Sequence, residues 1–291
     1  MLSLLAASAS AADPIYWSEL GLRPYLFEIG GFQLRFYSLA YLIGVIFAYW
    51  HLSKMIKSPG APLAQRHADD LFFYCTLGVI LGGRLGYAIF YQPELWANPV
   101  DVLKLWEGGM SFHGGLIGVL VAIAWVSRRG ELSFLRVCDY IAVNVPMGML
   151  LGRLANFNNG ELWGRISDVP WAMVFPRAGE VARHPSQLYQ AGLEGLVLLI
   201  VLMLLFWKTK ARYRPGLLVG IFTLGMGIAR FVNEFFREPD AQLADFAART
   251  GLSMGQWLTI PLILIGLIVT IYAVRSKPVG TGQANTATTA A

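Results

Sequence analysis

The sequence predicts an all-α polytopic membrane protein with seven transmembrane helices. Two observations predict this class. First, 56% of the 291 residues are hydrophobic and only 14% are charged, whereas a soluble globular chain carries about 25% charged residues. Second, long stretches are almost free of charge, namely residues 116–126, 196–207 and 260–274. A segment in lipid must satisfy its backbone hydrogen bonds internally, and a helix does so.

Seven segments have the length and apolar character of a membrane span. Each is close to the roughly 20 residues that cross about 30 Å of hydrocarbon. The predicted spans are residues 36–53, 69–91, 111–127, 135–156, 186–207, 215–236 and 256–274. We interpret residues 36–275 as one transmembrane domain.

Two segments flank this domain. Residues 15–35 are amphipathic and aromatic, so we expect residues 1–35 to lie on the outer membrane surface. The first twelve residues look like a clipped signal sequence, but they lack a basic start. A poorly ordered extension, or a start site placed too early, explains them better. Residues 276–291 are of low complexity, and we expect them to form a disordered cytoplasmic tail.

The basic residues predict the orientation of the helices. One set of loops holds 12 of them close to span ends: Lys54, Lys57, Arg66, Arg128, Arg129, Arg136, Lys208, Lys210, Arg212, Arg214, Arg275 and Lys277. The other side holds 8, spread over longer segments: Arg23, Arg35, Lys104, Arg165, Arg177, Arg183, Arg237 and Arg249. Since cytoplasmic loops carry the excess of Lys and Arg, we expect the amino terminus outside and the carboxyl terminus inside.

The cysteines and the net charge indicate no other class. Cys75 and Cys138 both fall inside predicted spans, so we interpret them as packing residues rather than as a disulfide. The net charge of +5 is explained by membrane orientation, because no basic stripe interleaved with aromatic residues marks a nucleic-acid surface. We therefore expect no nucleic-acid partner.

The stretch GRLANFNNGELWGR, residues 152–165, ends an apolar segment with charged and amide side chains. Ionisable groups inside a bilayer are costly, and they usually face a cavity and mark function. Arg153 and Asn156 are three residues apart and share a helical face. Asn158-Asn159-Gly160 predicts a sharp turn near the membrane surface, followed by Glu161 and Gly164. The alternative is a buried ion pair that only holds helices together.

A second polar face lies in GIARFVNEFFREPD, residues 227–240. Arg230, Glu234 and Arg237 have the spacing i, i+4, i+7, which places them on one helical face. Glu234 can hold the guanidinium of Arg230, which suits bidentate binding of phosphate. Two arginine sites at one depth on two helices indicate a bound anionic head group. Structural pairing of these charges is again the alternative.

Two further motifs contain histidine. His113, in SFHGGLIG, stands at the outer start of the third span, where Ser111 is a candidate helix cap. Histidine titrates near neutral pH, as a general base must, and catalytic and structural roles are equally open for it. In RHPSQLYQAGLEG, residues 183–195, His184 stands at a helix entry and Glu194 lies deeper. We interpret this motif as a brace for the site.

Other single residues have two interpretations each. Arg84 could bind a head group or extend to the membrane surface, and Tyr37 could hydrogen-bond a lipid or belong to an aromatic belt. We expect Asp139 to pair with a neighbouring arginine. No HExxH, CxxC, paired-histidine or Gly-rich phosphate motif is present, so we expect neither metal nor cofactor.

These residues leave two function classes open. One is an enzyme that acts on an anionic phospholipid, and the other is a membrane transporter or binding protein for an anionic lipid or solute. Transporters often show internal repeats and polar groups at mid-depth. This chain has no repeat, and its polar groups gather toward one surface, which favours the enzyme.

Several motifs resemble those of the bacterial phosphatidylglycerol–prolipoprotein diacylglyceryl transferases. They are LGGRLGYAIFYQP, SFHGG, GRLANFNNGELWGR, RHPSQLYQ, ARFVNEFFREPDAQ and SMGQWLTIP. The resemblance covers about residues 14–275. It implies a seven-span inner-membrane enzyme with a periplasmic amino terminus and an active site toward the periplasm. The enzyme would move the diacylglyceryl group of phosphatidylglycerol onto the lipobox cysteine of a prolipoprotein and release glycerol 1-phosphate. Its partners are these two substrates and membrane lipids.

The resemblance also implies the site residues. The catalytic residues would be His113, Arg153 and Arg230. The substrate-binding residues would be Tyr37, Asn156, Asn159, Glu161, Gly164, Glu234 and Arg237. The arginines would stabilise the leaving phosphate, and His113 would deprotonate the thiol or position a lipid oxygen. Two residues depart from the family pattern: Ala155 replaces an expected glycine, and Met226 stands where some relatives have tyrosine.

Overall fold

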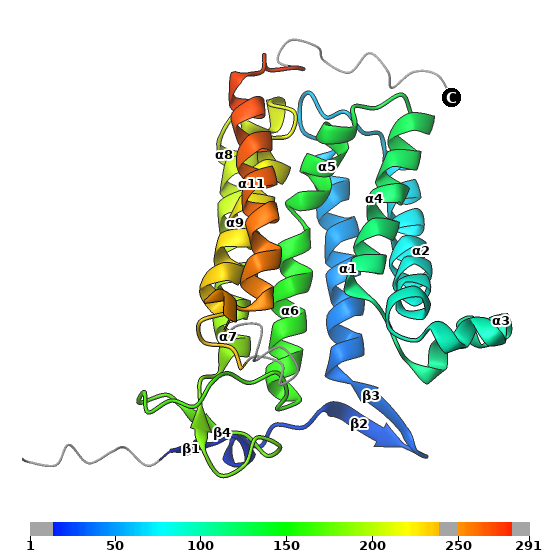
Figure 1. Ribbon diagram of the computed structural model, residues 1–291. Helices are drawn as coiled ribbons and strands as arrows, with labels where there is room; N and C mark the ends of the chain where they lie inside the picture. The colour runs from blue at the N-terminus through cyan, green and yellow to red at the C-terminus, as the bar shows by residue number, and fades with distance from the viewer. Residues whose placement is uncertain (1–13, 239–248, 281–291) are drawn as a thin grey trace, which may run out of the picture.

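The computed structural model describes residues 14–238 and 249–280. Most of the described residues are helical, and the long helices run in roughly one direction (Figure 1). The helices are α1 (Phe36–Met55), α2 (Gln65–Phe90), α3 (Pro99–Val102), α4 (Phe112–Arg129), α5 (Phe134–Ala142), α6 (Val145–Asn158), α7 (Ser186–Gln190), α8 (Leu198–Lys208), α9 (Leu217–Asn233) and α11 (Met254–Arg275). A π-helical segment, Ala191–Val197, joins α7 to α8.

Five helical segments are long and apolar enough to cross a membrane: Phe36–Met55, Gln65–Phe90, Phe134–Asn158, Ser186–Lys208 and Met254–Arg275. Two of them combine elements, since α5 continues into α6 and α7 continues through the π segment into α8. Helix α9 is apolar but shorter, and α4 has 18 residues. The chain is therefore a helical polytopic membrane protein.

Residues 15–35 contain strands, which the sequence did not predict. Strands β2 (Tyr25–Ile29) and β3 (Phe32–Arg35) pair as an antiparallel hairpin. Gly30 and Gly31 both have positive φ, 56° and 82°, as a tight hairpin turn requires. Figure 1 places this hairpin at one end of the bundle, here called the hairpin end, and residues 276–280 at the other, here called the tail end.

A small sheet and a second core lie at the hairpin end. Strand β1 (Ile15–Tyr16) pairs in parallel with β4 (Met173–Val174), which pairs antiparallel with β5 (Ala182–Arg183). Trp17 packs with Met173 and Phe175, and its indole N–H donates to the carbonyl of Phe157 at 2.8 Å. This sheet thus attaches the amino-terminal segment to the end of α6 and places β5 beside the turn that follows α6.

The larger core lies toward the tail end, where Leu52, Tyr140 and Phe206 come from three different helices. Asp139, on α5, is buried beside it and accepts the backbone N–H groups of Gly216 at 2.7 Å and Val219 at 2.9 Å. Asp139 therefore caps the amino terminus of α9. The neighbouring Arg136 interacts with Asp139 electrostatically, but the hydrogen bonds that Asp139 accepts come from this helix end, which the bundle packing brings to the carboxylate.

The carboxyl-terminal part of the described chain contacts the tail end of the bundle. The backbone N–H of Val279 donates to the carbonyl of Tyr213 at 2.8 Å, and Arg214 donates to the carbonyl of Ser276 at 3.2 Å. Residues 281–291, the rest of the predicted tail, lie outside the described residues.

Helices α2 and α4 approach each other closely through glycines. Gly78 and Gly82 face Gly114 and Gly118, and a Cβ atom at any of them would collide with backbone across the interface. Small residues of this kind let helix backbones approach in a membrane. This contact places α4, and with it His113, against α2.

Arg84, on α2, binds backbone and not a head group. It is buried, and its guanidinium donates to the carbonyl oxygens of Asp101 and Val102, both at 2.8 Å, and of Gly108. These carbonyls belong to the segment of residues 92–110, which includes α3 and projects from the bundle at the hairpin end (Figure 1). Arg84 thus holds this segment against α2.

Replacing Arg84 with alanine is expected to loosen residues 92–110. The change removes several charge-assisted hydrogen bonds, each of which contributes about 1.5–3 kcal/mol, so the free energy of unfolding should fall by about 3 kcal/mol. Limited proteolysis should cut the segment faster, and the melting temperature in detergent should fall. Arg128→Ala, which changes an exposed arginine on α4, is the control. Equal proteolysis of the two variants would contradict this role.

Candidate active site

The arginine cluster joins three segments of the bundle, the ends of which lie toward the hairpin end (Figure 1). Arg153 comes from α6, Glu194 from the π segment, and Arg230 from the last turn of α9. The Nη2 atom of Arg153 is 3.7 Å from Oε2 of Glu194, and Nη1 of Arg230 is 4.0 Å from Oε1 of the same carboxylate. Two arginines that are 77 positions apart in the sequence therefore share one acid.

Glu234 forms the second half of the cluster. Its Oε1 atom lies 2.8 Å from Nη2 of Arg230 and 3.4 Å from Nη1 of Arg237. Its Oε2 atom accepts the hydroxyl of Ser253 at 2.9 Å, and Ser253 also caps α11. Helix α9 ends at Asn233. The structure thus brings together the three residues that the i, i+4, i+7 spacing predicted, although only the first of them is within the helix.

The turn after α6 is organised around Glu161. The side-chain amides of Asn156 and Asn159 each donate to its Oε1 atom at 3.0 Å. Gln187 donates to its backbone carbonyl at 2.7 Å. Gly160 adopts a positive φ of 62°, which agrees with the predicted turn. Both asparagine side chains are thereby held in place by Glu161.

Gly164 connects this turn to the neighbouring segments. Its N–H donates to the carbonyl of His184 at 2.8 Å, and the N–H of Arg165 donates to the carbonyl of Phe236 at 2.9 Å. The Nε atom of Arg165 also donates to the carbonyl of Arg237 at 2.9 Å. The loop after α6, the start of α7 and the chain after α9 therefore form one hydrogen-bonded unit around the arginines.

Tyr37 and His113 hold different positions relative to this cluster. Tyr37, at the start of α1, is within electrostatic range of Arg153 and Glu161, and its ring packs on Tyr41. His113 is exposed near the start of α4, where Ser111 caps the helix as predicted by accepting the N–H of Gly114. In the described part of the chain, no hydrogen bond or ion pair joins His113 to the arginines.

His184 lies outside the long apolar segments, and its Nδ1 atom is 3.1 Å from the hydroxyl of Tyr189. That hydroxyl accepts the indole N–H of Trp171 at 2.6 Å, so its own hydrogen is free to donate to a neutral imidazole. Burial lowers the pKa of His184, and the Asp168 carboxylate partly opposes this shift. The folded protein therefore favours the uncharged ring.

This shift predicts a pH dependence of stability. The unfolded chain takes up the proton of His184 near pH 6.5, whereas the folded chain does so only at lower pH. Between these values the unfolded state binds more protons, so this contribution to stability is present above about pH 6.5 and is lost as the pH falls below it. The melting temperature should drop less between pH 7.5 and 5.5 in His184→Asn than in the wild type. Equal drops would contradict the assignment.

From the sequence, Glu194 was placed only in a motif that braces the site, and Ser253 was assigned no role in it. Glu194 is the only charged residue in the predicted span 186–207, which was the signal that could have placed it among the arginines. Ser253 begins the pattern SMGQ, a capping box in which Gln256 completes the pair, but its bond to Glu234 depends on the packing of α11 against α9.

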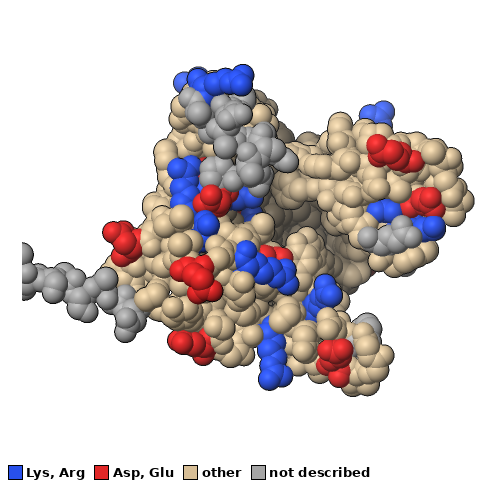
Figure 2. Space-filling model, turned by 60° about the horizontal axis from the view of Figure 1, so that its bottom comes forward, with Lys and Arg blue, Asp and Glu red and all other residues tan. Residues whose placement is uncertain are grey.

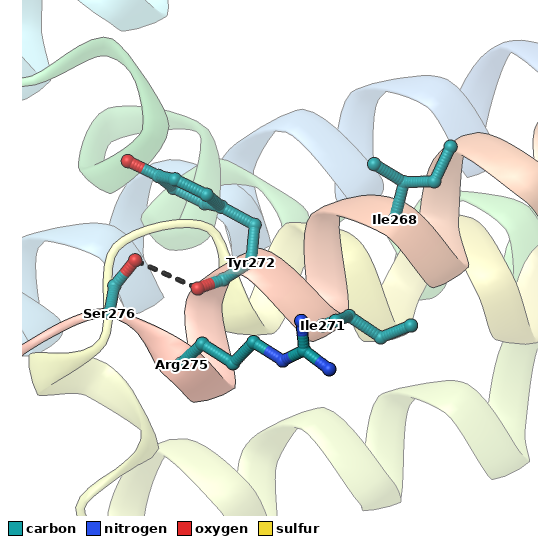
Figure 3. Close-up of a pocket in the computed structure, with 5 residues that line it drawn as sticks. All are labelled: Ile268, Ile271, Tyr272, Arg275 and Ser276. Carbon is teal, nitrogen blue, oxygen red and sulfur yellow. Dashed lines mark hydrogen bonds between the residues drawn. The ribbon is translucent and has the colours of Figure 1, made fainter.

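The surface at the hairpin end is recessed. Figure 2 shows acidic and basic side chains on this face, and a hollow between the part that contains α6, α9 and α11 and the part that contains α2, α3 and α4. A separate hollow lies at the tail end of α11, where Arg275 extends beside Ile271 (Figure 3). Arg275 is the one charged side chain that lines this second hollow. The hairpin end combines several arginines with carboxylates that hold them in place, so the candidate site is assigned to that end.

Known proteins are similar to this chain over most of its length. The family model described as "Prolipoprotein diacylglyceryl transferase" matches residues 24–272. A protein of Erythrobacter litoralis (strain HTCC2594), named phosphatidylglycerol–prolipoprotein diacylglyceryl transferase, is 67% identical over 94% of this chain and 97% of its own length. Proteins with the same name from Zymomonas mobilis and Rhodospirillum rubrum are 50% and 49% identical, over 87% and 88% of this chain and 91% and 93% of their own lengths. The chain therefore belongs to the prolipoprotein diacylglyceryl transferase family.

Proposed function

We propose that this chain transfers the diacylglyceryl group of phosphatidylglycerol to the lipobox cysteine thiol of a prolipoprotein, the first step of lipoprotein maturation. The observation that carries the proposal is the pair of arginines, Arg153 and Arg230, gathered around one carboxylate at the end of a helical membrane bundle. A phosphate group is the ligand that suits two guanidinium groups. The names of the relatives give the same reaction.

The chemistry requires a nucleophile, an electrophilic carbon and a leaving group. The substrate thiolate attacks the glycerol carbon, the bond from that carbon to the phosphate oxygen breaks, and glycerol 1-phosphate leaves with one additional negative charge. Arg153, Arg230 and Arg237 stabilise that charge by preorganised electrostatic interaction. Asn156 is placed to hydrogen-bond the phosphate or the glycerol. The chain's own thiols take no part, because Cys75 and Cys138 lie within the helical bundle.

His113 is the proposed base for the thiol. A thiol has a pKa of about 8.5, so a base raises the fraction of reactive thiolate at neutral pH. The exposed position of His113 leaves its imidazole accessible to a substrate. His113→Gln should therefore lower the transfer rate at pH 7 and lose less at pH 9, where the thiol ionises by itself. Near-normal turnover of this variant at pH 7 would contradict the base role.

The same proposal includes the placement in the membrane. Helices α4 and α9, added to the five longer segments, make seven spans. Basic residues gather near the ends of the helices at the tail end, which supports a cytoplasmic location for that end. The hairpin end and the arginine cluster then face the periplasm, with the chain in the bacterial inner membrane.

The test is a transfer assay with the full-length chain purified in detergent. Phosphatidylglycerol and a lipobox peptide are added, and the release of glycerol phosphate is measured. Release should require the cysteine of the peptide, so a peptide with serine at that position is the control. If phosphatidylglycerol binds and no glycerol phosphate is released with either peptide, the chain is a lipid-binding or transport protein instead.

A further inference from the structure

Glu194 lies at the centre of the arginine cluster, and the proposed reaction assigns it no part. Its side chain is fully buried. It stands in the π-helical segment, Ala191–Val197, between α7 and α8. A π-helical turn changes the direction in which side chains point and often occurs at functional sites. A charged residue at such a position inside an apolar helix requires a specific compensating partner.

The contacts of Glu194 with the arginines are electrostatic. The distances of 3.7 Å to Arg153 and 4.0 Å to Arg230 are too long for hydrogen bonds. The carboxylate accepts one hydrogen bond, from the side-chain amide of Asn233 at 3.3 Å. Its Oε2 atom has no hydrogen-bond partner among the described residues. Among the described residues, the N–H groups of Arg153 that face away from Glu194 make no hydrogen bond and stay available for a ligand, whereas Nη2 of Arg230 is held by Glu234 at 2.8 Å.

Glu194 is more deeply buried than the two arginines that it faces. The side chain of Glu194 is 0% exposed, whereas those of Arg153 and Arg230 are 25% and 19% exposed. A ligand from outside can thus reach the guanidinium groups, whereas the carboxylate is closed off from it. Without this carboxylate the two guanidinium groups, which interact electrostatically with each other, would repel one another and separate.

We propose that Glu194 is a positioning residue that holds Arg153 and Arg230 as a pair for one phosphate group. This inference rests on the proposed function and assigns a role within the same site. Arg153, Arg230 and Arg237 together with the carboxylates of Glu194 and Glu234 give the cluster a net charge of +1. That charge matches the single negative charge of a phosphodiester. Glu194 acts through the arginines and does not touch the substrate.

Glu194→Gln tests the role of the charge. Glutamine has nearly the same size and can still accept from Asn233, but it leaves the two arginines without their shared anion. Because a misplacement of about 1 Å can lower a rate about 100-fold, kcat should fall by about 30- to 100-fold. Glu194→Asp keeps the charge at a slightly greater distance and should recover part of the rate. Wild-type kcat in Glu194→Gln would overturn the proposal.

A double-variant cycle separates positioning from general support of the fold. If Glu194 acts through Arg230, adding Glu194→Gln to Arg230→Lys should lower the rate by less than about 3-fold, because coupled residues are not additive. Multiplication of the two single effects would overturn the proposal. The matched control is Asp139→Asn, which removes another buried carboxylate. Asp139 is on α5 and binds the amino terminus of α9, the opposite end of that helix from Arg230. This control should lower the melting temperature, and its effect on the rate should multiply with the effect of Arg230→Lys.

Glycerol phosphate release by the wild-type protein distinguishes a failure of this inference from a failure of the proposed function. If the wild type releases no glycerol phosphate, the proposed function fails, and the variants are compared by their dissociation constant for phosphatidylglycerol in detergent micelles. The dissociation constant of Glu194→Gln for phosphatidylglycerol should then differ from that of the wild type by at least about 10-fold. Its melting temperature should be closer to that of the wild type than the melting temperature of Asp139→Asn is. Equal dissociation constants would overturn the positioning role.

Discussion

Arg153→Lys is expected to lower the rate of diacylglyceryl transfer by about 100- to 1,000-fold, the range seen when one preorganised charge-stabilising donor is lost. Lysine keeps the positive charge, so long-range attraction of the anionic lipid should persist. It replaces a planar fork of several donors with one ammonium group. In the structure, Arg153 directs one end of its guanidinium toward Glu194 and leaves part of the side chain exposed. The single ammonium group of a lysine cannot contact Glu194 and a ligand on the opposite side at the same time.

The measurement is glycerol phosphate release at saturating phosphatidylglycerol and peptide, so that kcat is separated from KM. We expect the loss mainly in kcat, because the second negative charge on the phosphate appears only as the carbon–oxygen bond breaks. Arg177→Lys, at an exposed arginine of the hairpin end, is the control and should stay within about 2-fold. A loss confined to KM would show that Arg153 serves only to bind the lipid.

Gly164→Ala is expected to lower kcat/KM by about 100-fold although alanine adds one methyl group and no charge. A Cβ atom at this position would lie 2.7 Å from the carbonyl oxygen of His184, 2.8 Å from its Cβ atom, and closer still to the carbonyl oxygen of Phe236. Backbone on both sides cannot rotate away as a flexible side chain can. The loop after α6 must therefore move away from Arg237, and the hydrogen-bonded unit around the arginines opens.

The control for Gly164→Ala is Gly148→Ala, because that position on α6 has open space for a Cβ atom. Alanine is also the better helix former by about 1 kcal/mol, so this variant should keep full activity and equal or higher stability. Activity and melting temperature are measured for both. If Gly164→Ala keeps more than about half of the wild-type kcat/KM, the loop is not required to be rigid.

The sequence was sufficient for the features that depend on neighbouring positions along the chain. Hydropathy located the apolar segments, since a span needs a continuous run of apolar residues. The spacing of Arg230 and Glu234 predicted an ion pair that the structure shows at 2.8 Å. The Asn-Asn-Gly pattern predicted the turn that ends α6. The motifs were also sufficient for the family, which the similarity to known proteins shows.

Only the tertiary structure decided which distant residues become partners. The same kind of buried acid binds a helix terminus at Asp139 and two guanidinium groups at Glu194, and nothing local to either residue distinguishes these outcomes. Arg84 likewise could have bound lipid, but the packing of residues 92–110 brought carbonyl groups to it. The physical reason is that helical periodicity determines which side chains share a face, whereas helix packing, and at Glu194 a π-helical turn, determines what that face meets.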